Sequence, residues 1–328
     1  MALTPVDEIH ALQIQAGTVG RKAGHAFEDE ITLEINGLKY PADVSNASKK
    51  HLFSGSPGVL LLNKIAADNG IAKVKSAVAI STGALATSEE GRKWLTVNGA
   101  NVSRCKSDIV VTLTDEKGTE LTAGVSTKQC NNAQPTNAQL YFTTARGFVT
   151  LLRNNEIAVS EDALIELRKF CGDNGFRPLD DPAASKGRNV DPRRFFWEEL
   201  EKKARNEWET TLSVHQDAVT TLLLQKAYID DPFVPDFLVH KTRAAPSWNS
   251  TEVAIYAIPE LVKLSRKHSA FVTRPYRVRK GSYKDPIGVE HQAPRFGVVQ
   301  MQRGGQAQHP EQLQFNLAAG YFYLLENL

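Results

Sequence analysis

The chain has 328 residues, of which 41% are hydrophobic and 23% charged, with 15 Pro and 22 Gly. This length and composition are those of a globular protein with one large domain or two smaller ones, and they exclude a disordered or fibrous chain. The net charge is only +2, but residues 240–303 hold twelve Lys/Arg and four Asp/Glu, so basic charge is concentrated near the C-terminus. This composition is typical of a surface that binds the phosphates of nucleic acid. It is equally typical of a basic surface that only faces solvent.

Membrane and secretion signals are missing from the parts of the sequence where they would be expected. No apolar run approaches the roughly 20 residues of a membrane helix. The first residues, "MALTPVDEIH", lack the basic and apolar regions of a signal peptide. We therefore expect a cytoplasmic protein with no membrane partner. Its cysteines are odd in number and have no C-x-x-C spacing, which favours buried thiols over disulfides or a zinc site.

The N-terminal third predicts two helices. Residues 20–36 carry apolar side chains at four-residue spacing and end at an Asn-Gly pair, a pattern typical of a helix. Residues 59–70, "VLLLNKIAADNG", predict a second helix that ends at its glycine. Residues 74–87 fit a helix or a strand.

A β-hairpin follows. Residues 107–113, "SDIVVTL", and residues 121–128, "LTAGVSTK", are rich in β-branched side chains and flank the turn "TDEKGTE". If the hairpin folds about Gly118, Asp108 lies opposite Lys128, with their Cβ atoms about 5 Å apart. The hairpin therefore places a carboxylate and an ammonium group in one site.

The rest of the chain is expected to be largely helical and then to return to strands. Residues 137–155 have helical spacing, and residues 160–227 are mostly helical in pattern with a Pro/Gly/Asp-rich break. The segments "FGVVQMQ" (296–302) and "LQFNLAAGYFYLL" (313–325) are candidate strands.

The Ser107-Asp108 pair, the hairpin and "VSTK" at residues 125–128 together resemble the motif of PD-(D/E)xK nucleases, in particular type II restriction endonucleases. The resemblance covers about the first 150 residues. It departs from the motif in two places, because serine replaces the proline before the aspartate and Ser126 replaces the second carboxylate. Similar S-x-K enzymes take the missing carboxylate from a helix. Glu28 in "GRKAGHAFEDE" is our candidate, and its neighbours Asp29 and Glu30 are alternatives.

The resemblance implies a role for each residue. Asp108, the backbone carbonyl of Thr127, and Glu28, directly or through water, would hold Mg²⁺. Lys128, beside Ser126, would orient or help deprotonate the attacking water and stabilise negative charge at the phosphorus. A divalent cation suits this chemistry because it neutralises a phosphate and lowers the pKa of bound water. The alternative is a solvated hairpin, in which Asp108 and Lys128 form an exposed ion pair that contributes at most about 1 kcal/mol.

Two sets of side chains are candidates for contacting DNA. Amides can read adenine, arginine can read guanine, and lysine and arginine hold phosphates. An amide-rich loop follows Lys128, although its amides could instead cap the next helix. Gln300 and Gln302 lie on one face of a strand, and that face could equally be solvated. The predicted contacts are Gln129, Asn131, Asn132, Gln134, Arg274, Arg277, Arg279, Gln300, Gln302 and Arg303.

We therefore expect an α/β protein with a restriction-endonuclease-like core, in which helices flank a central mixed β-sheet, plus a helical subdomain. Residues 1–155 would form the nuclease core, 156–235 the helical subdomain, and 236–328 a basic part that completes the core and the DNA cleft. The expected function is Mg²⁺-dependent cleavage of double-stranded DNA at a short specific sequence by a homodimer. The rivals are a repair or modification-dependent nuclease of the same fold and a DNA-binding protein without catalysis.

Overall fold

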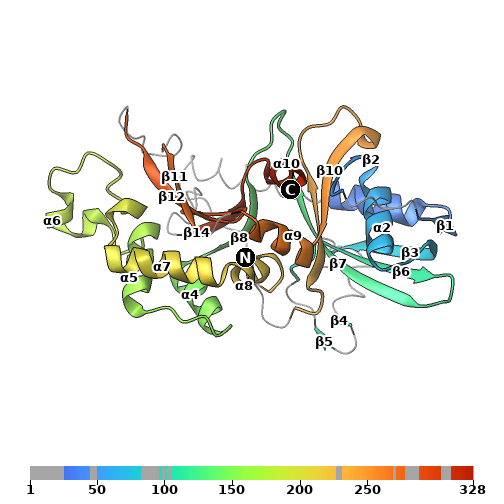
Figure 1. Ribbon diagram of the computed structural model, residues 1–328, viewed down its shortest axis with the longest axis horizontal. Helices are drawn as coiled ribbons and strands as arrows, with labels where there is room; N and C mark the ends of the chain where they lie inside the picture. The colour runs from blue at the N-terminus through green and yellow to red at the C-terminus, as the bar shows by residue number, and fades with distance from the viewer. Residues whose placement is uncertain are drawn as a thin grey trace. The chain divides into compact units, whose positions relative to one another are not determined.

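The computed structural model describes residues 26–44, 50–82, 96–97, 100–101, 105–226, 231–268, 271–277, 288–303 and 312–327 (Figure 1). The chain forms two compact units, each built on its own β-sheet. The seven-stranded unit draws on Ala16–Ala138, Leu224–Leu264 and Ala319–Leu328, and the five-stranded unit on Met1–Gln15, Gln139–Leu223 and Ser265–Ala318. Each sheet therefore combines segments that are far apart in the sequence.

The seven-stranded sheet has the order β1-β3-β6-β7-β9-β10-β2. Strands β7 and β9 are parallel, and the other five neighbouring pairs are antiparallel. The expected α/β class with a mixed sheet is confirmed. The strands are β1 (Ala42–Asp43), β2 (Leu52–Gly55), β3 (Lys73–Ser81), β6 (Ile109–Asp115), β7 (Glu120–Gln129), β9 (Pro235–Lys241) and β10 (Thr251–Ala257), and the same unit contains the small pair β4 (Thr96–Val97) and β5 (Ala100–Asn101).

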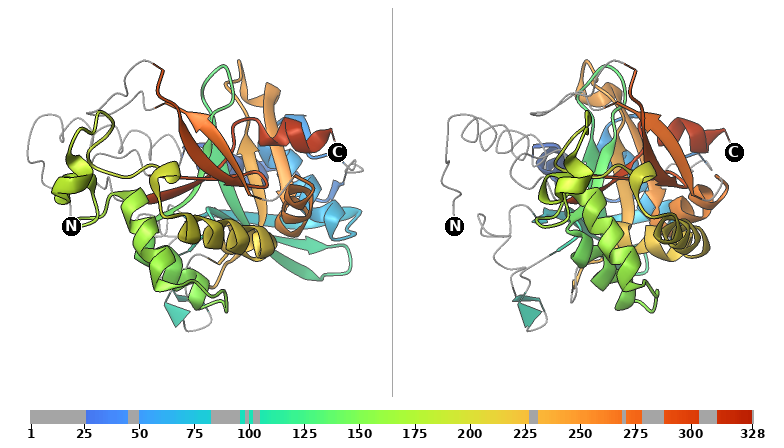
Figure 2. Two further views of the ribbon diagram at one scale, coloured as in Figure 1. Left: turned by 60° about the vertical axis from the view of Figure 1, so that its left-hand side comes forward. Right: turned by 90° about the vertical axis from the view of Figure 1, so that its left-hand side faces the viewer.

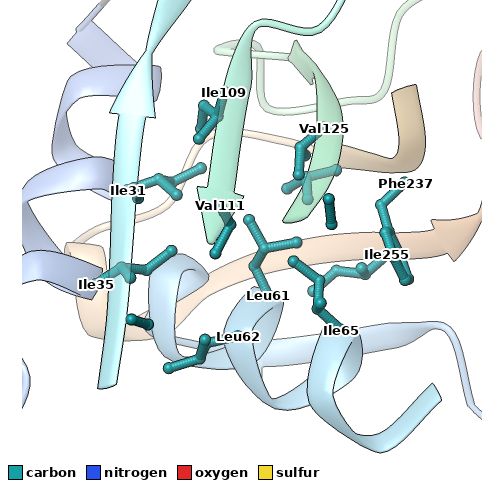
Figure 3. Close-up of a cluster of buried hydrophobic side chains, with 14 of the residues drawn as sticks. Ile31, Ile35, Leu61, Leu62, Ile65, Ile109, Val111, Val125, Phe237 and Ile255 are labelled. Atoms are coloured by element: carbon teal, nitrogen blue, oxygen red, sulfur yellow. The ribbon is translucent and has the colours of Figure 1, made fainter. Parts of the chain in front are cut away.

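Two helices bury their apolar stripes against one face of this sheet. They are residues 26–37 and α2 (Pro57–Asp68), which begins with a proline in its first turn and is followed by Asn69. Figure 3 shows side chains of both helices meeting those of the strands. Both predicted helices are confirmed over the described residues, and the predicted positions 20–25 lie outside them. The labelled core side chains are Ile31, Ile35, Leu61, Leu62, Ile65, Ile109, Val111, Val125, Phe237 and Ile255.

The seven-stranded unit also includes α10 (Tyr321–Glu326), which packs by its aromatic side chains. Tyr321 stacks on His240 of β9 at 5.7 Å between ring centroids, and Phe322 meets the same ring edge-on at 5.4 Å. His240 is consequently 1% exposed. A 3₁₀ turn at Trp248–Ser250 precedes β10, and helix α9 (Ile258–Arg266) follows it.

The five-stranded sheet has the order β11-β12-β13-β14-β8. Phe148 of α4 packs on Phe315 at 4.5 Å and on Trp208 at 5.9 Å, which joins the sheet to the helices beside it. Helices α4, α5 and α7 lie side by side (Figure 2). The elements are β8 (Ala138–Thr143), β11 (Val272–Tyr276), β12 (His291–Phe296), β13 (Val299–Arg303), β14 (Leu313–Leu317), α4 (Ala145–Arg153), α5 (Glu161–Cys171), α6 (Pro182–Ser185), α7 (Lys202–Val214) and α8 (Gln216–Leu224), with 3₁₀ turns at Pro178–Asp180 and Trp197–Glu199.

Two local predictions were wrong in part. The predicted helix 137–155 begins as strand β8, and α4 starts only after Thr144, whose side chain accepts a hydrogen bond from the Gly147 N–H at 3.0 Å. In β8 burial alternates from residue to residue, which is the period of a strand. The predicted strand 313–325 ends at Leu317, because Gly320 adopts φ +70° and the chain continues as α10. The prediction that residues 160–227 are mostly helical is confirmed over the described residues, which hold α5, α6, α7, α8 and two 3₁₀ turns.

Across the described part of the chain, every helix is too short or too polar to cross a membrane.

Candidate active site

The hairpin is present, and its register differs from the prediction by two residues. Asp115 N–H donates to the Thr119 carbonyl at 3.0 Å, and Ile109 lies opposite Val125, so the hairpin centres on Lys117. The predicted centre, Gly118, is the last residue of the turn and adopts φ +83°, a conformation that glycine tolerates best. Asp108 therefore lies two residues away from the position opposite Lys128. A shift of two leaves every side chain on its original face, so Asp108 and Lys128 still share a face.

The carboxylate of Asp108 binds the backbone of strand β7 just before β6 begins. Asp108 N–H donates to the Val125 carbonyl at 2.8 Å, so the backbone groups of Val125, and of Thr127 two residues further on, face β6. Because β6 begins only at Ile109, the Asp108 side chain meets Thr127 instead: Oδ2 accepts from the Thr127 N–H at 2.7 Å. Ser126 Oγ donates to the same oxygen at 3.2 Å. The other carboxylate oxygen, Oδ1, makes no hydrogen bond to any described residue.

Lys128 completes the arrangement from the same strand. Its Nζ donates to the Thr127 carbonyl at 2.7 Å and to Ser126 Oγ at 3.2 Å, and it lies 3.8 Å from Asp108 Oδ2. The Lys128 side chain is 18% exposed and that of Asp108 is 32% exposed, so the pair is partly open to solvent. Asp108 and Lys128 thus hold the N–H and the carbonyl of one residue, Thr127.

Glu28 reaches the same residue from the helix at residues 26–37. The buried neighbours Phe27 and Ile31 fix this helix on the core. Glu28, which is 8% exposed, accepts a hydrogen bond from Thr127 Oγ1 at 3.0 Å through Oε1. Asp29 and Glu30 are exposed. The structure therefore brings Asp108, Ser126, Lys128 and Glu28 together around Thr127.

Residues 231–233 bind the two residues that precede Asp108, a contact that the sequence pattern did not indicate. Asp231 accepts from the Lys106 N–H at 2.6 Å through Oδ2 and from the Phe233 N–H at 2.9 Å through Oδ1. Ser107, which occupies the place of the motif's proline, is 1% exposed and donates from Oγ to the Phe233 carbonyl at 2.6 Å. Residues 231–233 thereby fix the two residues before Asp108.

Gly124 lets this segment approach the hairpin. A Cβ atom at position 124 would lie 2.3 Å from Ser107 Oγ and 2.6 Å from the Val234 carbonyl oxygen. Both distances are far shorter than any ordinary contact, so only glycine fits here without displacement. A glycine in the interior of a strand is the one sequence signal that could have pointed to this close approach.

Burial and the charge of Lys128 disfavour further positive charge nearby. Burial, with Lys128 as the next contributor, lowers the pKa of Lys106 to about 7. The same two causes, in the same order, lower the pKa of His240 to about 3; His240 is the residue opposite Lys128 on β9. His240 is therefore neutral at ordinary pH, and its Nδ1 lies 3.3 Å from the Tyr321 hydroxyl.

The oxygen atoms at this site suit Mg²⁺. They are the open Oδ1 of Asp108, the carbonyl of Thr127, which has a second lone pair, and the carboxylate of Glu28. Within the described residues, no three His, Cys, Asp or Glu side chains cluster to form a metal site by themselves. Two carboxylates and a carbonyl match a cation that keeps several of its waters, as Mg²⁺ does.

The amide loop after Lys128 is held at its two ends. Cys130 N–H donates to the Lys241 carbonyl at 2.8 Å, and the Ala244 N–H donates to the Asn132 carbonyl at 2.9 Å. Asn131 accepts from Lys241 Nζ at 2.8 Å and donates to Gln129 Oε1 at 3.3 Å. The side chains of Asn131, Asn132 and Gln134 are exposed, and that of Gln129 is half-buried. Asn137, the amide of this loop nearest the next element, does not cap a helix: it precedes strand β8, and its Oδ1 accepts from the Ala319 N–H at 2.8 Å.

The candidate DNA contacts nearer the C-terminus belong to the five-stranded unit and divide between two faces of its sheet. Gln300 and Gln302 are half-buried on one face of β13, while Val299 and Met301 fill the core on the other. Arg303 is on the core face, where its side chain is 8% exposed and lies 3.6 Å from the buried carboxylate of Asp191. Arg274 and Arg277 are exposed, and Arg279 lies outside the described residues.

Comparison with known proteins yields distant structural similarity but no match in sequence. No family model matches the sequence, and no curated protein matches it either. Among solved structures, the restriction endonuclease MspI in complex with its cognate DNA is similar over 73% of this chain and 70% of its own, with 12% sequence identity and a TM-score of 0.40. The function proposed below therefore rests on the geometry around Thr127.

Proposed function

We propose that this protein is a Mg²⁺-dependent type II restriction endonuclease that hydrolyses double-stranded DNA at a short specific sequence. The observation that carries the proposal is the capping of Thr127, whose N–H is bound by Asp108 and whose carbonyl is bound by Lys128, with Glu28 on its side chain. A solvated hairpin has no need to gather two carboxylates and a lysine, all partly or fully buried, at the end of a strand.

The residues of the chain supply the ligands and the charge that phosphodiester hydrolysis needs. Asp108 Oδ1, the Thr127 carbonyl and Glu28 would hold the cation. Bound Mg²⁺ would neutralise the scissile phosphate and lower the pKa of the attacking water. Lys128 Nζ, held by the Thr127 carbonyl and Ser126 Oγ, is placed to orient that water and to stabilise negative charge at phosphorus.

The attacking water loses a proton as it forms the new P–O bond. The bond to the leaving sugar oxygen breaks, and that oxygen takes up a proton from solvent and leaves as an alcohol. Ser126 orients both charged groups, because its hydroxyl contacts Asp108 Oδ2 and Lys128 Nζ. Ser126 carries no charge, although the motif has a carboxylate at this position. Glu28 would supply that negative charge from the helix.

The proposed enzyme acts in the cytoplasm as a homodimer and cleaves DNA at a specific site. A two-fold symmetric dimer matches a palindromic site, since both have the same symmetry. The basic residues near the C-terminus and the exposed amides after Lys128 would supply the DNA contacts.

The rival with an observation in its favour is a DNA-binding protein without catalysis. Asp108 and Lys128 satisfy backbone groups of Thr127, and this alone is a structural use for both side chains. Digestion of unmethylated bacteriophage DNA with Mg²⁺ or with EDTA separates the two. Discrete fragments that require Mg²⁺ support the nuclease, while intact DNA with normal DNA binding supports the rival.

A further inference from the structure

A row of glutamine side chains crosses the five-stranded sheet. Gln302 on β13 donates from Nε2 to Gln314 Oε1 on β14 at 3.3 Å, and Gln314 donates from Nε2 to Gln139 Oε1 on β8 at 2.6 Å. β13, β14 and β8 are consecutive in the sheet. We call these three side chains the amide row. All three residues are half-buried, so each keeps part of its surface accessible.

The amide row has hydrogen-bonding groups to spare. A glutamine amide has two N–H donors and one oxygen acceptor with two lone pairs. The two bonds within the row use only one N–H of Gln302 and one of Gln314. Asn316, which faces Gln300 across β13 and β14 on the same side of the sheet, is 2% exposed, and its Nδ2 has no acceptor among the described residues. This face therefore has a surplus of donors.

Two arginines on the same face add positive charge. Arg295 lies opposite Gln300, and Arg274 lies opposite Ala293, two positions from Arg295, so both share the face of the amide row. Neither guanidinium has a carboxylate partner among the described residues. Burial and then the nearby charge of Arg274 lower the pKa of Arg295, whose Nε donates to the Gly297 carbonyl at 2.9 Å.

Duplex DNA is the ligand whose chemistry matches this face. Glutamine amides pair with the N6 and N7 atoms of adenine, and arginines bind phosphate oxygens. The amide row spans two strand spacings, about 10 Å, which fits within the roughly 12 Å width of the major groove. The bonds within the row fix the amide planes before any ligand binds, so less side-chain entropy is lost on binding.

We propose that Gln139, Gln314 and Gln302 form a base-reading surface for A·T pairs of duplex DNA, with Arg274 and Arg295 holding the adjacent phosphates. This inference rests on the proposed function in that it names how the DNA sequence would be read. It adds Gln139, Gln314 and Arg295 to the predicted contacts, and it assigns Gln302 to bases and Arg274 to phosphates.

The test is a binding selection from a pool of duplexes with a randomised centre, with Ca²⁺ in place of Mg²⁺ so that bound DNA is not cut. We expect the full-length protein to enrich a motif that contains A·T pairs. Gln314→Ala and Gln302→Ala should reduce the preference at one or two positions about 10- to 100-fold and leave the rest of the motif intact. Gln292→Ala is the matched control, because Gln292 is an exposed glutamine of the same sheet whose place on β12 points it to the opposite face.

A second measurement uses the arginines. Arg274→Gln and Arg295→Gln should weaken binding uniformly across sequences, and each should reduce the slope of log K against log salt by about 1. Thermal unfolding of every variant identifies any that fail to fold, and the arginine variants then test the surface independently of the glutamine variants.

The outcomes separate this inference from the nuclease proposal. An unchanged motif in both glutamine variants, a uniform loss of affinity in them, or no enriched motif in the wild type would each overturn the base-reading role. Failure of the wild type to cut phage DNA with Mg²⁺ would overturn the nuclease and leave the selection result to decide the inference by itself.

Discussion

Replacing Gly124 with alanine should damage the site without touching any of its charged groups. The new Cβ would lie 2.3 Å from Ser107 Oγ and 2.6 Å from the Val234 carbonyl oxygen. Neither neighbour can yield freely, because Ser107 is 1% exposed and bonded to the Phe233 carbonyl at 2.6 Å, and the second contact is backbone. The strand or the 231–234 segment must therefore move.

The magnitude follows from two costs. Overpacking a well-packed site costs about 1–3 kcal/mol, and the loss of the Ser107 hydrogen bond costs about 1 kcal/mol more. We expect Gly124→Ala to lower the free energy of unfolding by about 2–4 kcal/mol on these grounds. Because Ser107 directly precedes Asp108, cleavage should fall as well, even at temperatures where the variant is fully folded.

The assay is urea unfolding of four proteins: the wild type, Gly124→Ala, Ser107→Ala and the double variant. Ser107→Ala removes the closer of the two clashing atoms, so the substitutions should couple, and the double variant should be more stable than additivity predicts. Gly37→Ala is the control, since a Cβ at Gly37 meets nothing within 4 Å. A Gly124→Ala variant within about 0.5 kcal/mol of the wild type, or strict additivity with Ser107→Ala, would refute the packing argument.

Three further predictions concern charged and titratable groups. His240, whose pKa is lowered to about 3 mainly by burial, is neutral in the folded chain and protonated in the unfolded chain between pH 6.5 and 3, so its contribution to stability is lost as pH falls. Across that window the free energy of unfolding of the wild type should fall by about 1.4 kcal/mol per pH unit more than that of His240→Gln. The same dependence of this free energy on pH in both proteins from pH 6 to 4 would contradict this. Asp231→Asn should lower the free energy of unfolding by about 1–3 kcal/mol, because one of the N–H groups of Lys106 and Phe233 loses its acceptor; an unchanged urea midpoint would count against the bracing role of Asp231. Glu28→Gln should change stability by less than about 1 kcal/mol but raise the Mg²⁺ concentration for half-maximal cleavage about 10-fold, whereas the exposed control Glu30→Gln should do neither; equal Mg²⁺ titrations for the two would remove Glu28 from the metal site.

The sequence predicted the hairpin and the face on which Asp108 and Lys128 lie, because both depend on local periodicity. Its register was wrong by two, since the pattern alone does not reveal that Gly118 ends the turn with φ +83° instead of occupying its centre. The error left the site intact because strand faces repeat every two residues.

The sequence pattern did not predict contacts between residues that are far apart in the chain. The bond from Asp231 to Lys106, and the closeness of Val234 to Gly124, join segments more than one hundred residues apart. Strand β8 was interpreted as helix because Leu140, Thr144 and Phe148 happen to repeat at four, while the strand itself is stabilised by its neighbours in the sheet. The preference for Glu28 over Asp29 and Glu30 came from the sequence, because Glu28 borders the apolar stripe of its helix, and the structure places it against Thr127.

The central claim is that the groups around Thr127 catalyse hydrolysis, and Asp108→Asn tests it most directly. Asparagine keeps an oxygen for the Thr127 N–H and loses the carboxylate charge, so the fold should remain while Mg²⁺-dependent cleavage of unmethylated phage DNA falls at least about 100-fold. Binding of the same DNA by the variant, measured by fluorescence anisotropy, should be close to that of the wild type. Discrete wild-type fragments that disappear in Asp108→Asn, with folding and binding retained, are the predicted result. Cleavage at the wild-type rate by a correctly folded Asp108→Asn variant would contradict the account.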